Sequence, residues 1–101
     1  MIDIATLKKS SFDPYLNSTF EVHTQSAGIV DVQLIEVTDD SQGNMENFSL
    51  IFKGPLEKPF DQRIHKVKHP GMGEQDLFLV PITYGKTDAM YYQAVFSRML
   101  A

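Results

Sequence analysis

Apolar and polar residues alternate in six short runs along the chain. The runs are rich in Val, Ile, Phe, Tyr and Thr and cover 19–25, 29–38, 47–53, 62–69, 75–83 and 89–97. Alternation with a period of two places every second side chain on one face, which is typical of a half-buried strand. Turn-forming residues separate the runs about every ten residues, and this spacing favours an all-β sandwich or barrel.

Two of the runs depart from simple alternation. In 29–38 the apolar phase reverses between Leu34 and Ile35, which predicts a β-bulge or a sharp bend. The run 75–83 is apolar on both faces, so we expect a central strand that is covered on both sides. Pro81 has no backbone N–H to donate and therefore predicts an edge position or a bulge near the end of that strand.

Residues 1–18 lack the alternation and predict a short N-terminal helical segment. Asp3 or Thr6 is a candidate N-cap for one or two helical turns, and Pro14 favours the start of a second turn. We expect this segment to close one end of the β structure through four apolar side chains: Leu7, Phe12, Tyr15 and Leu16.

The fold class that follows is all-β, as a single domain over 1–101. A helical cap occupies 1–18, and about six antiparallel strands occupy 19–97. We expect each strand to be a neighbour of the next in most cases, in a meander that curls into a small or partly open barrel. A two-sheet sandwich is the second choice.

The composition is that of an ordinary globular domain, with 43% hydrophobic and 22% charged residues among 101. Cysteine is absent, which removes thiolate chemistry and disulfides and favours a reducing, cytoplasmic setting. The early acid Asp3 argues against a signal peptide. The most apolar stretch, 77–82, is six residues long, far short of a membrane span. We therefore expect a soluble protein with no membrane partner.

Charge is distributed unevenly along the chain. The net charge is −4 and the isoelectric point is near 5.2. The segment 51–70 nevertheless holds two acids and five bases: Lys53, Lys58, Arg63, Lys66 and Lys68. Such a strip can contact phosphate, and binding would then weaken steeply with salt. The acidic balance of the whole chain argues against nucleic acid as a partner.

Two histidines carry the alternative hypothesis, a small-molecule or metal-binding barrel with a histidine-lined pocket. His65 and His69 share one face of their strand but lie about 13 Å apart along it, too far to share a zinc ion unless the strand breaks at Pro70. Otherwise His69 bonds to the backbone of its own turn and His65 packs partly buried. Because catalytic, metal-ligand and phosphate-binding motifs are missing, we expect no catalytic residue, metal or cofactor.

Aromatic residues provide the remaining candidates for function. Tyr84, Tyr91 and Met90 surround the connection between the last two predicted strands. Exposed tyrosines beside a methionine are typical of protein-contact surfaces. The opposing interpretation places Tyr92 in the core and Tyr91 along the outer face of its strand.

Several blocks also carry a family resemblance. They are Phe12 with Pro14, Thr19-Phe20, Glu36-Val37-Thr38, Phe-Ser-Leu-Ile-Phe-x-Gly-Pro over 48–55, His-Pro-x-x-Gly over 69–73, Leu-Phe-Leu-Val-Pro-Ile over 77–82 and Met-x-Tyr-x-Ala-Val-Phe over 90–96. Through them the sequence resembles an uncharacterised family of small bacterial β-rich proteins, a domain of unknown function. The resemblance implies no activity; an association of its members with phage-tail-like genes implies an accessory of a tail or appendage.

Together these patterns favour a non-enzymatic module that binds a protein partner or assembles with copies of itself. The candidate contact residues are Tyr84, Tyr91 and Met90. The alternative is the pocket lined by His65 and His69.

Overall fold

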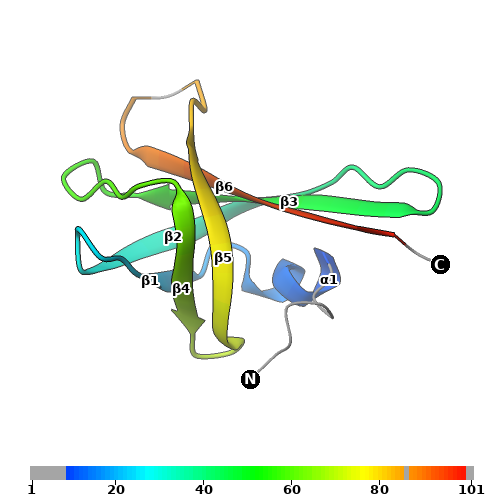
Figure 1. The fold of residues 1–101 in the computed structure, drawn as a ribbon, viewed down its shortest axis with the longest axis horizontal. Coiled ribbons are helices and arrows are strands. Elements are labelled where there is room, and N and C mark those ends of the chain that lie inside the picture. Colours follow the sequence, from blue (N-terminus) through cyan, green and yellow to red (C-terminus); the bar gives the residue numbers. More distant parts are fainter. Residues whose placement is uncertain (1–8, 86, 100–101) are drawn as a thin grey trace.

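The computed structural model describes residues 9–85 and 87–99, and within them six antiparallel strands close into a barrel (Figure 1). The strands are β1 (Thr19–His23), β2 (Ile29–Asp39), β3 (Met45–Gly54), β4 (Arg63–His69), β5 (Gly73–Ile82) and β6 (Met90–Met99). Their order around the barrel is β1-β2-β3-β6-β5-β4. The all-β class, the antiparallel pairing and the barrel are confirmed.

The local features of the hairpin β1–β2–β3 follow from the sequence. Gly28 has a φ of 70°, which costs glycine little, and it allows the tight turn between β1 and β2. The register of β2 on β3 shifts between Leu34 and Glu36. This shift is the predicted bulge, and it bends β2 at the point where the strand leaves the barrel.

The expectation that strands in most cases neighbour the next strand is confirmed at four of the five connections, and the exception lies between β3 and β4. β3 pairs with β6, and β4 returns to pair with β1 through Glu21–Lys68, Val22–Val67 and His23–Lys66. The segment 55–62 makes this crossing and carries Phe60, which is 3% exposed and stacks on Tyr92. The crossing is stabilised because it brings an aromatic side chain into the core, a contact that strand periodicity does not encode.

The expected N-terminal helical segment is also wrong among the described residues. They contain only a single helical turn, α1 (Lys9–Phe12), and a 3-10 turn, η2 (Asp13–Tyr15). Pro14 supplies no backbone N–H, and Asn17 adopts a φ of 70°, so the chain turns into β1 and does not continue as a helix. The predicted Leu7 contact lies outside the described residues.

Two contacts of the expected cap do form, through Phe12 and through Tyr15, which packs partly buried against the core. Phe12 is fully buried, and its ring centroid lies 6.0 Å from that of Phe48 and 5.7 Å from that of Phe96. Leu16, by contrast, is 43% exposed. The N-terminal turn thus holds the barrel end through Phe12, and the aromatic cluster extends this core under β3 and β6.

The barrel interior is filled by apolar side chains from all six strands. Alternate positions point inward, as the period of two predicts. The largest fully buried side chains are Tyr92, Phe12, Phe20, Phe52, Leu34, Leu50, Leu77, Leu79, Val22, Val30 and Val32. Burial of this row is the main favourable contribution to folding.

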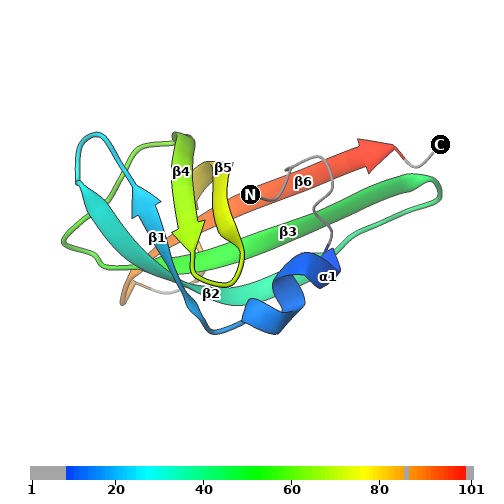
Figure 2. The same ribbon diagram turned by 90° about the horizontal axis from the view of Figure 1, so that it is seen from below.

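Two strands continue beyond the barrel. β3 and β6 pair over their whole length, from Met45–Met99 to Gly54–Met90. Figures 1 and 2 show both strands running past β5, with α1 lying against one face of this extension. Within the described residues β5 pairs with β6 at three positions, Val80–Gln93, Pro81–Tyr92 and Ile82–Tyr91. The barrel is therefore closed by a short seam that includes a proline.

β5 differs from the prediction that both its faces are covered. Leu77 and Leu79 point inward and are buried, whereas Phe78 between them is 50% exposed. The strand lies in a single curved sheet, and among the described residues no second layer of structure packs on its outer side. The apolar residues on both faces of this strand predict burial of both faces, but the outer face is exposed at Phe78.

Candidate functional site

The three residues predicted to form an exposed tyrosine surface do not lie on one side of the sheet. Tyr91 is only 2% exposed, while Tyr84 and Met90 are half-buried. Met90 packs against the hydrophobic core, and the rings of Tyr84 and Tyr91 stack with centroids 4.8 Å apart. Tyr84 therefore covers Tyr91, and the expectation that Tyr91 presents an exposed surface is wrong.

Hydrogen bonds attach the loop 83–89 to neighbouring strands. The Tyr84 hydroxyl donates to the Glu36 carboxylate, and this bond lowers the pKa of Glu36 and raises that of Tyr84. The Tyr91 hydroxyl donates to Asp88 Oδ1 at 2.8 Å, which lowers the pKa of Asp88. Lys53 lies 3.4 Å from Asp88 as well. These partners make the tyrosines anchors of the loop.

His65 and His69 border different depressions of the surface. His65 is 3% exposed, and its Nε2 lies 2.8 Å from the Asp61 carbonyl oxygen. It borders a depression of about 160 Å³ with Asp61 and Arg63. His69 borders a separate groove of about 530 Å³ with Glu74. The histidine-lined interior pocket needs space inside the barrel, and the core side chains occupy it.

Among the described residues, one hydrogen bond joins a serine to a histidine, and it joins Ser18 to His69. The Gly71 N–H donates to His69 Nδ1 at 2.9 Å, so the hydrogen-bond network places the proton of the neutral ring on Nε2. Nε2 then donates to Ser18 Oγ at 2.9 Å, and Ser18 donates to the Tyr15 carbonyl. Burial lowers the pKa of His69, in accord with a neutral ring.

This arrangement does not suit nucleophilic catalysis. An activated serine needs a base that accepts its proton, whereas the His69 ring donates one to Ser18. The bonds instead join the N-terminal turn to the β4–β5 turn, where Tyr15 also donates to the Gly71 carbonyl at 3.2 Å. The prediction that His69 bonds to the backbone of its own turn is confirmed. The Ser18 contact spans 51 residues, and no sequence pattern indicated it.

No metal-ion cluster occurs among residues 9–85 and 87–99: no three His, Asp or Glu side chains there gather closely enough to hold an ion. A broad cleft of about 790 Å³ lies beside Lys53, Leu56 and Asp88. It mixes both signs of charge, and Lys53 and Asp88 within it pair with each other.

The basic side chains of segment 51–70 are largely engaged within the chain. Arg63 lies 3.7 Å from Asp61 and Lys66 lies 3.0 Å from Glu74. Lys58 donates to the Ile29 carbonyl at 3.3 Å. Pairing with nearby acids reduces the positive field that phosphate binding requires.

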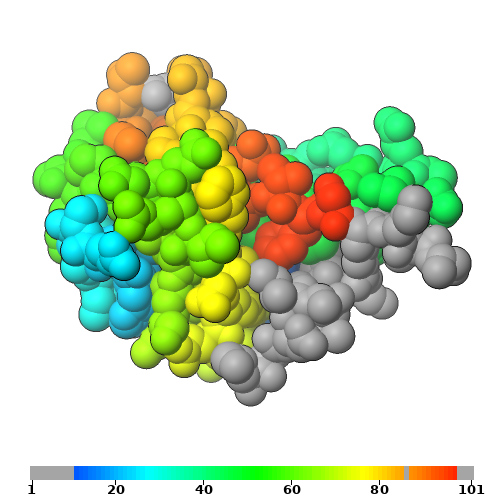
Figure 3. Space-filling model, viewed as in Figure 1, coloured from blue at the N-terminus to red at the C-terminus, as the bar shows by residue number. Residues whose placement is uncertain are grey.

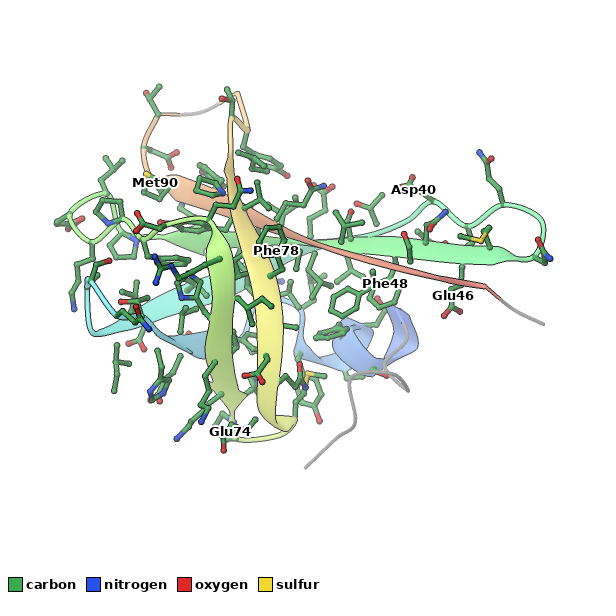
Figure 4. All side chains as sticks on the ribbon, viewed as in Figure 1. Asp40, Glu46, Phe48, Glu74, Phe78 and Met90 are labelled. Atoms are coloured by element: carbon green, nitrogen blue, oxygen red, sulfur yellow. The ribbon has the colours of Figure 1, made fainter. Side chains whose placement is uncertain are left out.

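An exposed apolar surface lies on the outer side of β4, β5 and β6. Ile64 and Phe78 are cross-strand partners and are 66% and 50% exposed. Val95 lies two residues beyond Gln93, the last β6 residue that pairs with β5, and is 63% exposed. Figure 4 labels Phe78 where β5 crosses β6. We call Ile64, Phe78 and Val95 the outer apolar surface.

An open strand edge adjoins this surface. Beyond Gln93, β6 pairs with β3 on one side, and no described strand pairs with it on the other. In Figure 3 this part of β6, in red, lies directly beside β5, in yellow, on the same face of the molecule. We call residues 94–99 the open β6 edge. Unpaired backbone groups along such an edge are a template for another strand.

The alternation of residues in β4 indicates this surface, whereas the overall composition does not. Ile64 alternates with Lys66 and Lys68 on the solvent face of β4, so an isoleucine stands in a row of lysines. This isoleucine is informative because its cross-strand partner Phe78 is exposed as well, and grouped exposed apolar residues mark contact sites.

The fold and its surfaces define a small closed β-barrel protein with one apolar, open strand edge. A family model described as a domain of unknown function (DUF6916) matches residues 7–96, and the chain belongs to this family. Searches of curated proteins and of solved structures gave no match. Among the residues that the structure describes, no helix has the length and apolar character needed to cross a membrane.

Proposed function

We propose that this chain is a non-enzymatic protein-interaction or assembly module that docks through the outer apolar surface and the open β6 edge. The observation that carries the proposal is the continuity of the two features. Three large apolar side chains, each at least half exposed, lie on or beside a strand edge that no described strand pairs with. Grouped exposed apolar residues mark contact sites, whereas scattered single ones do not.

Backbone pairing and side-chain burial supply different parts of such a contact. A partner strand on the open β6 edge gains main-chain hydrogen bonds, and apolar pockets beside the edge give specificity. Phe78 and Ile64 present the aromatic and aliphatic surface that a partner can bury. The wider expectation of an accessory role in a tail or appendage structure stays a prediction.

This proposal replaces the tyrosine surface with a neighbouring one. Tyr84 stacks on Tyr91 and donates a hydrogen bond to Glu36, while Met90 packs against the hydrophobic core. Their contribution to binding is at most indirect, through the position of the loop 83–89.

Native mass spectrometry of wild-type and variant protein tests the proposal. Phe78→Ser removes the centre of the outer apolar surface, and Ile29→Ser removes a side chain that is equally exposed, at 53%, on a distant part of the barrel. Each protein is measured alone and after incubation with extract of its source. We expect species heavier than 11.4 kDa for wild type and Ile29→Ser, and their loss for Phe78→Ser.

Two results contradict the proposal. One is a bare monomer for wild-type protein in both settings. The other is equal association by Phe78→Ser and wild type, because a contact that survives removal of the Phe78 ring does not use this surface.

A further inference from the structure

We infer that the partner strand belongs to a second copy of this chain, which pairs antiparallel with the open β6 edge about a two-fold axis opposite Phe96. The inference rests on the proposed function and names the partner for that site. It follows from the charges on the open edges of the fold and from the geometry of a strand that pairs with itself.

The charges along the sheet margins favour self-pairing at β6. The β2 margin of the extension carries Glu36 and Asp39, whereas the acids on the outer face of β5 lie opposite Lys66 and Lys68 of β4. Two copies that met along the β2 margin would place acids near acids, in a molecule whose net charge is −4. Like charges opposite one another destabilise strand pairs.

The central part of the open β6 edge lacks this obstacle, and its one charged residue, Arg98, would lie opposite Ala94 of the other copy when the axis is opposite Phe96. Residues 94–97 are Ala, Val, Phe and Ser, so they carry no charge. Natural edges are protected against pairing by lysine, proline or a bulge, and 94–97 contain no lysine or proline and keep regular pairing with β3. Two copies can therefore approach along this strand without like charges meeting.

Symmetry restricts the register. In an antiparallel pair, residues opposite each other point to the same face. When both strands are β6, Val95 must therefore face a residue of its own phase. An axis opposite Phe96 satisfies this condition: it pairs Phe96 with its own copy and Val95 with Ser97. Phe96 already stacks on Phe48 with centroids 4.7 Å apart, so a Phe96 pair would extend an existing aromatic cluster across the axis.

The same arrangement places the second copy beside the outer apolar surface. The incoming strand lies on the side of β6 where β5 pairs at Gln93, so its far end approaches β5, the strand that carries Phe78. The three-stranded extension β2–β3–β6 of each copy then joins into one continuous sheet. An isologous contact of this kind closes at two copies and leaves no further open β6 edge.

Sedimentation equilibrium measures the assembly, and Val95→Lys perturbs it. The Val95 side chain is 63% exposed, so lysine there should leave the monomer folded while it places a charge at the centre of the contact. Ile29→Lys is the matched control. We expect wild type and Ile29→Lys to reach twice 11.4 kDa with rising concentration, and Val95→Lys to dimerise about tenfold or more weakly.

Disulfide trapping measures the register, because the native chain contains no cysteine. Directly opposite positions have Cβ atoms about 5 Å apart, which suits a disulfide. The two copies of residue 95 are offset by two residues along the paired strands. The distance between their Cα atoms is about 8 Å, which is too long for a disulfide. A mixture of Val95→Cys and Ser97→Cys should therefore cross-link to each other, while each alone should not.

The outcomes separate this inference from the proposed function. Wild-type protein could stay monomeric at every concentration and bind a different protein, with that binding lost in Val95→Lys. This result would contradict a second copy as the partner and would support the docking surface. A monomer with no partner overturns both. A dimer that Val95→Lys leaves intact, or efficient cross-linking of Ser97→Cys with itself, contradicts the Phe96 axis.

Discussion

A buried amide provides the sharpest test of the barrel interior. Gln75 lies on the inner face of β5, opposite Val67, and is only 6% exposed. Neither its Oε1 nor its Nε2 has a hydrogen-bond partner among the described residues. Replacement by methionine, Gln75→Met, keeps the length and the unbranched shape of the side chain and removes both polar atoms.

The expected effect is an increase in stability. Burying an amide without partners costs about 1–3 kcal/mol, and Gln75→Met should recover a gain of that size. For a domain of this length, each kcal/mol corresponds to a rise in Tm of about 4–8 °C. Urea unfolding followed by circular dichroism measures the free energy of unfolding, with an unchanged m value expected.

The control is Gln62→Met, at an exposed position, where a change within about 0.5 kcal/mol is expected. A Gln75→Met protein that is equal to or less stable than wild type would refute the reasoning. It would mean that the amide forms hydrogen bonds in solution, to water or to another part of the chain.

Three further perturbations test the contacts around the barrel. In Gly71→Ala the new Cβ would lie 2.5 Å from the Tyr15 ring, so urea unfolding should show a loss of about 1–3 kcal/mol that shrinks in a Tyr15→Leu background. Burial lowers the pKa of His69 in the folded state. Its contribution to the free energy of unfolding is therefore complete above the pKa of the unfolded chain, near 6.5, and declines as the pH falls through that pKa. His69→Asn should flatten this part of a stability-against-pH profile. Tyr84→Phe removes the bond that lowers the pKa of Glu36, so an NMR titration should show that pKa rising; an unchanged value would contradict the contact.

The sequence was sufficient for the strands because their period is local. Six apolar runs became six strands, and the reversal at Leu34 became a bulge. Strand periodicity did not predict the pairing of β3 with β6. This pairing depends on a contact between Phe60 and Tyr92, which are 32 residues apart. Periodicity reports which face is apolar and gives no information on which strand lies alongside.

The candidate site shows the same division. Tyr91 and Phe78 both stand in apolar strands, and the sequence does not distinguish the side chain that a loop covers from the one left exposed. The structure reverses the expectation for both residues: Tyr91 is 2% exposed beneath Tyr84, and Phe78 is 50% exposed. The outcome depends on Tyr84, which stacks on Tyr91 and donates a hydrogen bond to Glu36 of β2.

The central claim is that another strand joins this protein along the open β6 edge, and amide hydrogen exchange tests it most directly. Alternate backbone N–H groups of 94–98 face away from β3 and have no partner in the described part of a single chain. We expect these amides to exchange fast in dilute protein and slowly at concentrations where the dimer forms, while Val95→Lys stays fast at both. Equal exchange at all concentrations, for wild type and variant alike, would contradict the account.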